Sequence, residues 1–317
     1  MKKFYPENLL IHTAENKNVL MSKAAIKEAY YSGKIIEARA TVCDKDHNLH
    51  VDLGVMKGII PRNEGAVGIE DGSARDIAII SRVNKPVQFR VIDFSTDEKG
   101  ETVAILSRRS VQLDCMREYI STLTPGCIID AVITHMEPFG VFADIGSGIS
   151  ALMPIDSISV SRIPHPSARF SAGEKIRAVV KSIDENGRIT LSYKELLGTW
   201  EENAAQFRPG ETVPGIIRSV ERYGIFVELA PNLAGLAEYV PGVEPGQHAS
   251  VYIKNLIPER MKIKLIIVDS FEAPYPNEPV TYYNKSSFID RWIYSPESCP
   301  KKVETVFSSY ELTETAI

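Results

Sequence analysis

Cysteine is scarce in this chain of 317 residues, which has only Cys43, Cys115, Cys127 and Cys299. No two of them are close in the sequence, so neither a disulfide framework nor a zinc knuckle is indicated. The chain has no run of about eighteen apolar residues, the length that a membrane-spanning helix requires. Its first residues, Met-Lys-Lys-Phe-Tyr-Pro-Glu, lack the apolar core of a signal peptide. We therefore expect a cytoplasmic protein with no membrane partner.

Sequence motifs of catalysis are also absent. We find no nucleophile motif, no paired carboxylates in a repeated apolar setting, and no phosphate-binding glycine loop followed by Lys-Ser or Lys-Thr. Aspartate and glutamate are spread over turns and linkers. We expect a protein that is not an enzyme, with no catalytic residues, no cofactor and no metal.

One short stretch occurs three times. Residues 137–146 read EPFGVFADIG, residues 222–229 read RYGIFVEL, and residues 47–54 give a weaker copy, HNLHVDLG. Such self-similarity indicates a repeated structural unit. Residues alternate faces along a strand, which predicts that Val141, Ala143 and Ile145 line a core while Phe142 and Asp144 face outward. A bulge at Gly140 would return Phe139 to the outer face beside Phe142.

Each copy continues with further alternating strands. In the middle copy the last two are residues 176–181 and 188–192, joined by a turn with Asn186 and Gly187, a strong hairpin signal. Five short antiparallel strands per copy are typical of an OB-type barrel, whose second and third strands and flanking loops bind oligonucleotides. The sequence predicts an all-β fold of three tandem five-stranded OB-fold barrels joined by short helical linkers.

These patterns divide the chain into segments. They are a leader with a helix (1–32), a degenerate barrel (33–109), a linker helix (110–124), a second barrel (125–194), a linker helix (195–208), a third barrel (209–268) and an acidic, proline-containing tail (269–317). Ser22 is the expected N-cap of the leader helix and Gly33 its stop, and this helix is expected to cover the first barrel or, alternatively, to bind a partner. Trp200 is expected to pack between barrels, not to stack on a base. The tail is expected to be loose and to lie back on the third barrel.

His47 and His50 occupy the positions of Phe139 and Phe142 in the first copy. Cys43 and several carboxylates lie nearby, but the alignment of the repeats accounts for these residues better than a metal site does. Histidine can stack weakly on bases. We prefer the interpretation that the first barrel is a degenerate copy without the aromatic pair, and that it serves protein contact or structure.

The repeats resemble the S-one (S1) family of RNA-binding repeats, named after the largest protein of the bacterial small ribosomal subunit. The marks are the Pro-Gly entry, Phe-Gly-Val-Phe before an alternating strand, and Asp184 to Arg188 leading into Ile-Thr-Leu-Ser-Tyr-Lys. The resemblance implies an RNA face with Phe139, Phe142, Asp184 and Arg188 in the middle copy. In the third copy it implies Tyr223, Phe226 and, for the arginine, Lys262. The family histidine is replaced by Pro61, Pro154 and Glu238, which leaves base stacking as the main contribution to binding.

Lys and Arg equal Asp and Glu in number within each expected barrel, so the net charge of −5 arises outside the barrels. Basic faces remain possible, from Arg177, Lys181 and Arg188 or from Lys254, Lys262 and Lys264. Tyr252 is expected to face outward beside Lys254. The expected RNA-binding residues are Phe139, Phe142, Lys181, Asp184, Arg188, Tyr223, Phe226, Tyr252, Lys254 and Lys262.

The resemblance implies a single-stranded RNA-binding protein of translation that holds mRNA near the small ribosomal subunit, with subunit proteins contacted through residues 1–109. Two alternatives stay open. One is a protein-interaction scaffold docking on the ribosome, in which partners bury the aromatic faces. The other is an RNA-binding regulator or an accessory protein of RNA decay.

Overall fold

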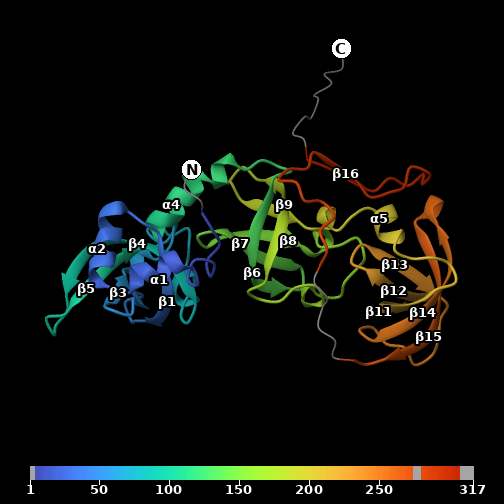
Figure 1. The fold of residues 1–317 in the computed structure, drawn as a ribbon, viewed down its shortest axis with the longest axis horizontal. Coiled ribbons are helices and arrows are strands. Elements are labelled where there is room, and N and C mark those ends of the chain that lie inside the picture. The colour runs from blue at the N-terminus through green and yellow to red at the C-terminus, as the bar shows by residue number, and fades with distance from the viewer. Residues whose placement is uncertain (1–3, 274–279, 308–317) are drawn as a thin grey trace, which may run out of the picture. The chain divides into compact units, whose positions relative to one another are not determined.

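Three closed five-stranded barrels follow one another along the chain in a computed structural model that describes residues 4–273 and 280–307 (Figure 1). The predicted all-β fold is thereby confirmed. The chain divides into two compact units. The first unit comprises Met1–Leu123, Asp130–Val132 and Asp144–Ser150, and the second comprises Thr124–Ile129, Ile133–Ala143 and Ala151–Ile317.

The first barrel has the strand order β1-β2-β3-β5-β4, with β3 and β5 parallel. Its strands are β1 (Ile36–Cys43), β2 (Leu49–Asp52), β3 (Lys57–Ile60), β4 (Pro86–Thr96) and β5 (Thr102–Ser107). The connection from β3 to β4 carries the short helices η1 (Arg62–Glu64) and α3 (Ile77–Ile80). Closure of the barrel removes free strand edges, which would otherwise pair with other chains.

Two helices precede this barrel, α1 (Ala14–Leu20) and α2 (Lys23–Ser32). As the sequence predicts, the Ser22 hydroxyl accepts a hydrogen bond from the Ala25 N–H at 3.1 Å, and Gly33 ends α2 in the left-handed conformation at φ 60°. Ile26 and Ala29 are buried in the same cluster as the barrel core. Helix α2 is therefore a lid on the first barrel, the first of the two expected roles.

The middle barrel is built from β6 (Ile128–Glu137), β7 (Gly140–Gly146), β8 (Ile149–Pro154), β9 (Lys175–Ile183) and β10 (Ile189–Ser192). The helices α4 (Arg109–Glu118) and η2 (Ile120–Thr122) precede it, and η3 (Ile155–Ser157) and η4 (Pro166–Ala168) lie between β8 and β9. Its strand order is β10-β8-β7-β6-β9.

The third barrel repeats the architecture with β11 (Thr212–Glu221), β12 (Gly224–Ala230), β13 (Leu233–Ala237), β14 (His248–Ile257) and β15 (Lys262–Phe271). The short helices η5 (Lys194–Leu196) and α5 (Trp200–Ala204) precede it, and η6 (Pro258–Arg260) joins β14 to β15. Trp200 is 3% exposed, and α5 contacts β13, so its expected packing role is confirmed.

A glycine opens the second strand of both ring-bearing barrels for the same steric reason. A Cβ on Gly140 would lie 2.4 Å from the Met153 carbonyl oxygen, and one on Gly224 would lie 2.5 Å from the Ala237 carbonyl oxygen. No side chain fits at such a distance. The first barrel has Asn48 at this position, and its β2 begins only at Leu49.

Asp144 does not face solvent, so this expectation was wrong. Its side chain is 2% exposed, and its Oδ2 accepts a hydrogen bond from the backbone N–H of Glu7 at 2.7 Å. The carboxylate also accepts from the N–H groups of Gly146 and Gly148. Glu7, in turn, receives a bidentate ion pair from Arg108 at 2.7 and 3.0 Å. Asp144 is thus a buried structural residue of the first unit.

The carboxyl-terminal segment contacts the third barrel, because the Tyr294 hydroxyl donates to the Asn232 carbonyl at 2.5 Å, but it also contacts the middle barrel, which was not expected. Its described part, 280–307, runs along the middle barrel, where the N–H of Ile128 donates to the Ser287 carbonyl at 2.8 Å and that of Ile289 donates to the Gly126 carbonyl at 2.9 Å. The segment contains the two-stranded sheet of β16 (Arg291–Ile293) and β17 (Glu304–Val306). Residues 274–279 and 308–317 of the expected tail lie outside the described residues. Within the described ranges, no helix has the length and apolar character needed to cross a bilayer.

Candidate nucleic-acid interface

A pair of aromatic rings stands on the outer surface of both the middle and the third barrel. Phe139 is 55% exposed and Phe142 is half-buried, with ring centroids 6.2 Å apart and planes at 88°. Tyr223 is 71% exposed, and its ring meets that of Phe226 at 6.1 Å and 85°. The repeated sequence thus produces the same edge-to-face pair twice. Outward aromatic rings of this kind serve as stacking platforms for unpaired bases.

The ring pair of the third barrel continues into a row of side chains across four strands. Phe226 on β12 pairs with Leu236 on β13, Leu236 pairs with Lys264 on β15, and Lys264 pairs with Asn255 on β14. Lys264 is exposed, and so is Lys262, two residues earlier on the same face of β15. A cation therefore lies two strands from the stacking ring, within the row that begins at Phe226.

Lys264 is not among the expected RNA-binding residues, although alternation along β15 already placed it on the face of Lys262. Tyr252 is 37% exposed and pairs with Ile266, so it lies on β14 three residues from Asn255. Lys254 is exposed next to Asn255. These two residues border the row on β14.

The middle barrel has fewer free cations than expected. When the two barrels are aligned, Thr190 corresponds to Lys264, because each pairs with the equivalent leucine of the third strand, Leu152 or Leu236. Arg188 corresponds to Lys262. Arg188 is exposed, whereas the Lys181 Nζ donates to the Ser157 hydroxyl at 3.0 Å.

Arg177, which the sequence offers for a basic face, is held by the carboxyl-terminal segment. Its guanidinium donates to the carbonyl oxygens of Asn284, at 2.9 Å, and Ser286, and it lies over the Tyr282 ring at 5.9 Å.

Asp184 closes the hairpin between β9 and β10. Its Oδ1 accepts hydrogen bonds from the backbone N–H groups of Asn186 at 2.9 Å and Arg188 at 2.8 Å. Asp44 and Asp97 in the first barrel make the same two contacts, to the residues two and four positions later. This aspartate turn recurs where no aromatic pair is present, so it is explained by hairpin geometry alone.

His135 on β6 is a ring that the sequence reasoning missed. It is exposed, and its imidazole lies nearly parallel to the Phe142 ring, at 22°, with centroids 6.4 Å apart. Its Nε2 is 2.7 Å from the Glu137 carboxylate. The sequence shows a histidine seven residues before Phe142, but it does not show that the two rings meet. The pairing of β6 with β7 brings them together.

The first barrel offers a different surface. His50 faces Asp44 with Nε2 and Oδ2 3.2 Å apart, and it pairs with Ile59, which pairs with Ile105. Desolvation opposes ionisation of Asp44, but hydrogen bonds from Asn48 and His50 outweigh it and lower the pKa of this carboxyl to about 2. No group of three or more His, Cys, Asp or Glu side chains in the described part of the chain is arranged to hold a metal ion.

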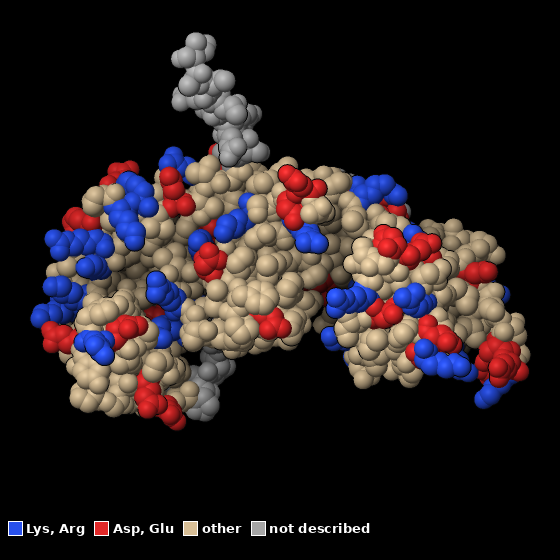
Figure 2. Space-filling view, turned by 180° about the vertical axis from the view of Figure 1, so that it is seen from behind, with Lys and Arg blue, Asp and Glu red and all other residues tan. Residues whose placement is uncertain are grey.

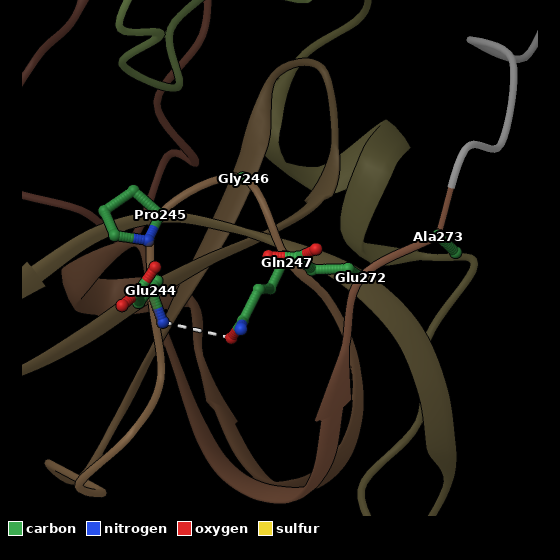
Figure 3. Close-up of a pocket in the computed structure, with 6 residues that line it drawn as sticks. All are labelled: Glu244, Pro245, Gly246, Gln247, Glu272 and Ala273. Atoms are coloured by element: carbon green, nitrogen blue, oxygen red, sulfur yellow. Dashed lines mark hydrogen bonds between the residues drawn. The ribbon is translucent and has the colours of Figure 1, made fainter.

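A hollow of about 490 Å³ lies on the third barrel (Figure 3). It is lined by Glu244, Pro245, Gly246, Gln247, Glu272 and Ala273, and the Glu244 N–H donates to the Gln247 side-chain oxygen at 3.0 Å. Two carboxylates without a facing cation repel a polyanion, so this hollow is not a candidate for the phosphate backbone. Figure 2 shows acidic and basic side chains intermixed over one face of the molecule.

The fold and these surfaces define a class: tandem OB-type barrel proteins with aromatic ring pairs exposed on the barrel wall. Comparison with known proteins agrees, because residues 122–194 match the family model described as S1 RNA binding domain. The small ribosomal subunit protein bS1 of Staphylococcus aureus (strain COL) is 29% identical over 284 residues, covering 84% of this chain and 68% of that protein. The bS1 homolog of Bacillus cereus (strain ATCC 10987 / NRS 248) is 27% identical over 319 residues, covering 88% and 77%.

The chain is thus similar to proteins of the S1 family, as the sequence resemblance predicts. Among solved structures, a multidomain protein with nucleic acid binding domains from Streptococcus pneumoniae TIGR4 is similar at 16% identity, with 75% of each chain covered and a TM-score of 0.24.

Proposed function

We propose that this protein binds single-stranded RNA without catalysing a reaction, and that it holds mRNA near the small ribosomal subunit in the cytoplasm. The observation that carries the proposal is the edge-to-face ring pair, present on two barrels and accessible on both. Base stacking on aromatic rings contributes about 1–3 kcal/mol per base and tolerates any sequence. The match of residues 122–194 to the S1 RNA binding domain supports the same class of ligand.

Phosphate contacts add a smaller, salt-dependent contribution. The exposed cations of the two ring-bearing barrels include Arg188, Lys254, Lys262 and Lys264. Each phosphate neutralised on a single strand contributes about −0.7 to the slope of log K against log salt. With about four contacts, the slope is therefore about −3.

A second function is proposed for residues 1–109, namely contact with proteins of the small ribosomal subunit. The first barrel lacks the ring pair, and in its place are His50 bound to Asp44 and the half-buried pair Ile59 and Ile105. Two isoleucines beside a carboxylate suit a protein partner better than a phosphate backbone.

A fluorescence titration with unstructured pyrimidine-rich RNA, at two salt concentrations, tests the proposal. We expect binding at low salt that weakens with salt along the slope given above. Absence of binding at low salt would contradict the RNA-binding proposal. Co-sedimentation with purified small subunits tests the site of action, and a protein found only in the free pool would favour a regulatory or RNA-decay role away from the ribosome.

A further inference from the structure

A buried ion-pair cluster joins the middle barrel to the third barrel within the second unit. The two Nη atoms of Arg169 donate to the two carboxylate oxygens of Glu228, each at 2.8 Å. Arg218 donates to the same two oxygens through Nε and Nη2, each at 2.9 Å. The three side chains are 7%, 4% and 9% exposed. We call this cluster the Glu228 clasp.

The Glu228 clasp is adjacent to a stacking ring. Arg169 follows η4 in the connection between β8 and β9 of the middle barrel, whereas Arg218 is on β11 and Glu228 on β12 of the third. Glu228 is two residues after Phe226, so both side chains project from the same outer face of β12. The middle barrel therefore contacts the third barrel on the same outer face that carries the third barrel's ring pair.

A second polar joint connects the same two barrels. Asn232, in the turn between β12 and β13, is fully buried, and its Oδ1 accepts from the Val160 N–H at 3.0 Å. Its Nδ2 donates to the carbonyl oxygens of Lys194 at 2.7 Å and Gly198 at 3.0 Å. The amide thus satisfies one acceptor and two donor positions with backbone groups from outside the third barrel.

Two separate joints prevent rotation of one barrel about the other. A bidentate pair fixes both distance and direction, and loss of Glu228 would leave two guanidiniums buried without their counter-charge, which is strongly unfavourable. The ring pairs of the two barrels are therefore held at a fixed separation, unlike binding sites on a flexible linker.

We propose that the middle and third barrels form one composite site for a single RNA strand long enough to reach both ring pairs, with Arg169, Glu228 and Asn232 as positioning residues. This inference rests on the proposed function. Two weak sites on one strand gain affinity through effective concentration, provided the geometry allows both to be occupied. Because the separation is fixed, RNA strands too short to bridge the two ring pairs gain no affinity. The affinity should therefore rise abruptly at the length that first bridges them.

The test is a fluorescence-anisotropy titration of the full chain with oligouridylates of increasing length. For the wild type we expect affinity to rise by at least about tenfold at one threshold length. In Arg169→Gln and Glu228→Gln, we expect this rise to shrink to less than about threefold, while affinity for oligonucleotides below the threshold stays within about twofold. The control is Arg291→Gln, which breaks an exposed ion pair with Glu304 on the small carboxyl-terminal sheet and leaves the rise intact.

Thermal unfolding identifies variants that no longer fold. If the clasp variants fail to fold, Asn232→Ala tests the second joint by the same titration. A wild type without a threshold overturns the inference, and so does a threshold that persists unchanged in a folded Arg169→Gln, Glu228→Gln or Asn232→Ala protein. Failure of the proposed function is distinct, because then even the oligonucleotides below the threshold do not bind.

Discussion

The imidazole of His135 lies at 22° to the ring of Phe142, with centroids 6.4 Å apart. The third barrel has Ser219 opposite Phe226, so the two ring-bearing barrels differ at this position. A third ring beside the pair extends the surface on which a base can stack. The middle barrel therefore has a platform of three rings, although it lacks the histidine of the family pattern.

We predict that His135→Ser weakens binding of short single-stranded RNA by about threefold to tenfold, consistent with loss of part of one stacking contact. The reciprocal change, Ser219→His, should strengthen binding by a similar factor. Isothermal titration with one short oligouridylate measures both. Equal affinities of wild type and His135→Ser would show that the imidazole takes no part in stacking.

We predict that Asp184 stabilises the hairpin between β9 and β10 and contributes little to RNA binding. Loss of its two backbone hydrogen bonds in Asp184→Ala should lower the free energy of unfolding by about 1–3 kcal/mol. Asp44→Ala and Asp97→Ala are matched controls, since they remove the same two contacts from first-barrel hairpins.

We expect all three aspartate variants to lose stability in urea and to keep RNA affinity within about twofold when folded, because none removes a stacking ring. Arg188→Ala should instead weaken binding and reduce the salt slope by about 0.7. A drop in affinity for Asp184→Ala as large as that for Arg188→Ala would assign the carboxylate to the RNA face.

Stability of the first unit should depend on pH through Asp144. The buried cluster around it holds three carboxyl groups, those of Glu7, Glu37 and Asp144, but only two guanidiniums, those of Arg82 and Arg108. Burial, and next the Glu7 carboxylate, raise the pKa of Asp144 to about 7 from an ordinary value of 3.8. Burial also raises the pKa of Glu37.

A carboxyl group with a raised pKa in the folded state binds protons more tightly when folded, so its contribution to stability is complete below its unfolded pKa and is lost as pH rises through the folded value. We predict that the free energy of unfolding falls between pH 5 and 8, by about 1.4 kcal/mol for each pH unit over which the folded state alone holds the proton. Asp144→Asn should be less stable overall but have a shallower slope in this window. Parallel slopes in urea denaturation would contradict the assignment.

The barrels were predictable because their signals are local. The alternation of residues 140–146, the Asn186-Gly187 turn and the caps of the leader helix each depend on neighbours within a few positions, and the threefold repetition strengthened each of them. The ring pairs followed from the same alternation, together with the glycine that a neighbouring carbonyl requires.

Contacts between distant segments gave no such signal. Asp144 was expected outside because its position alternates outward, but Glu7, 137 residues earlier, covers it. Arg177 was a candidate for a basic face, yet Asn284 and Ser286 bind it. A side chain's position on a strand predicts its direction, whereas what covers it depends on where other segments of the chain fold back.

The most direct test of the account removes both ring pairs from the full chain. We predict that the variant Phe139→Ala, Phe142→Ala, Tyr223→Ala, Phe226→Ala remains folded, because these rings lie outside the barrel cores, and loses at least about a hundredfold in affinity for unstructured pyrimidine-rich RNA. The control is His47→Ala with His50→Ala in the first barrel, which should bind RNA as the wild type does. Retention of wild-type affinity by the folded four-ring variant would contradict the claim that this protein holds RNA by stacking bases on these rings.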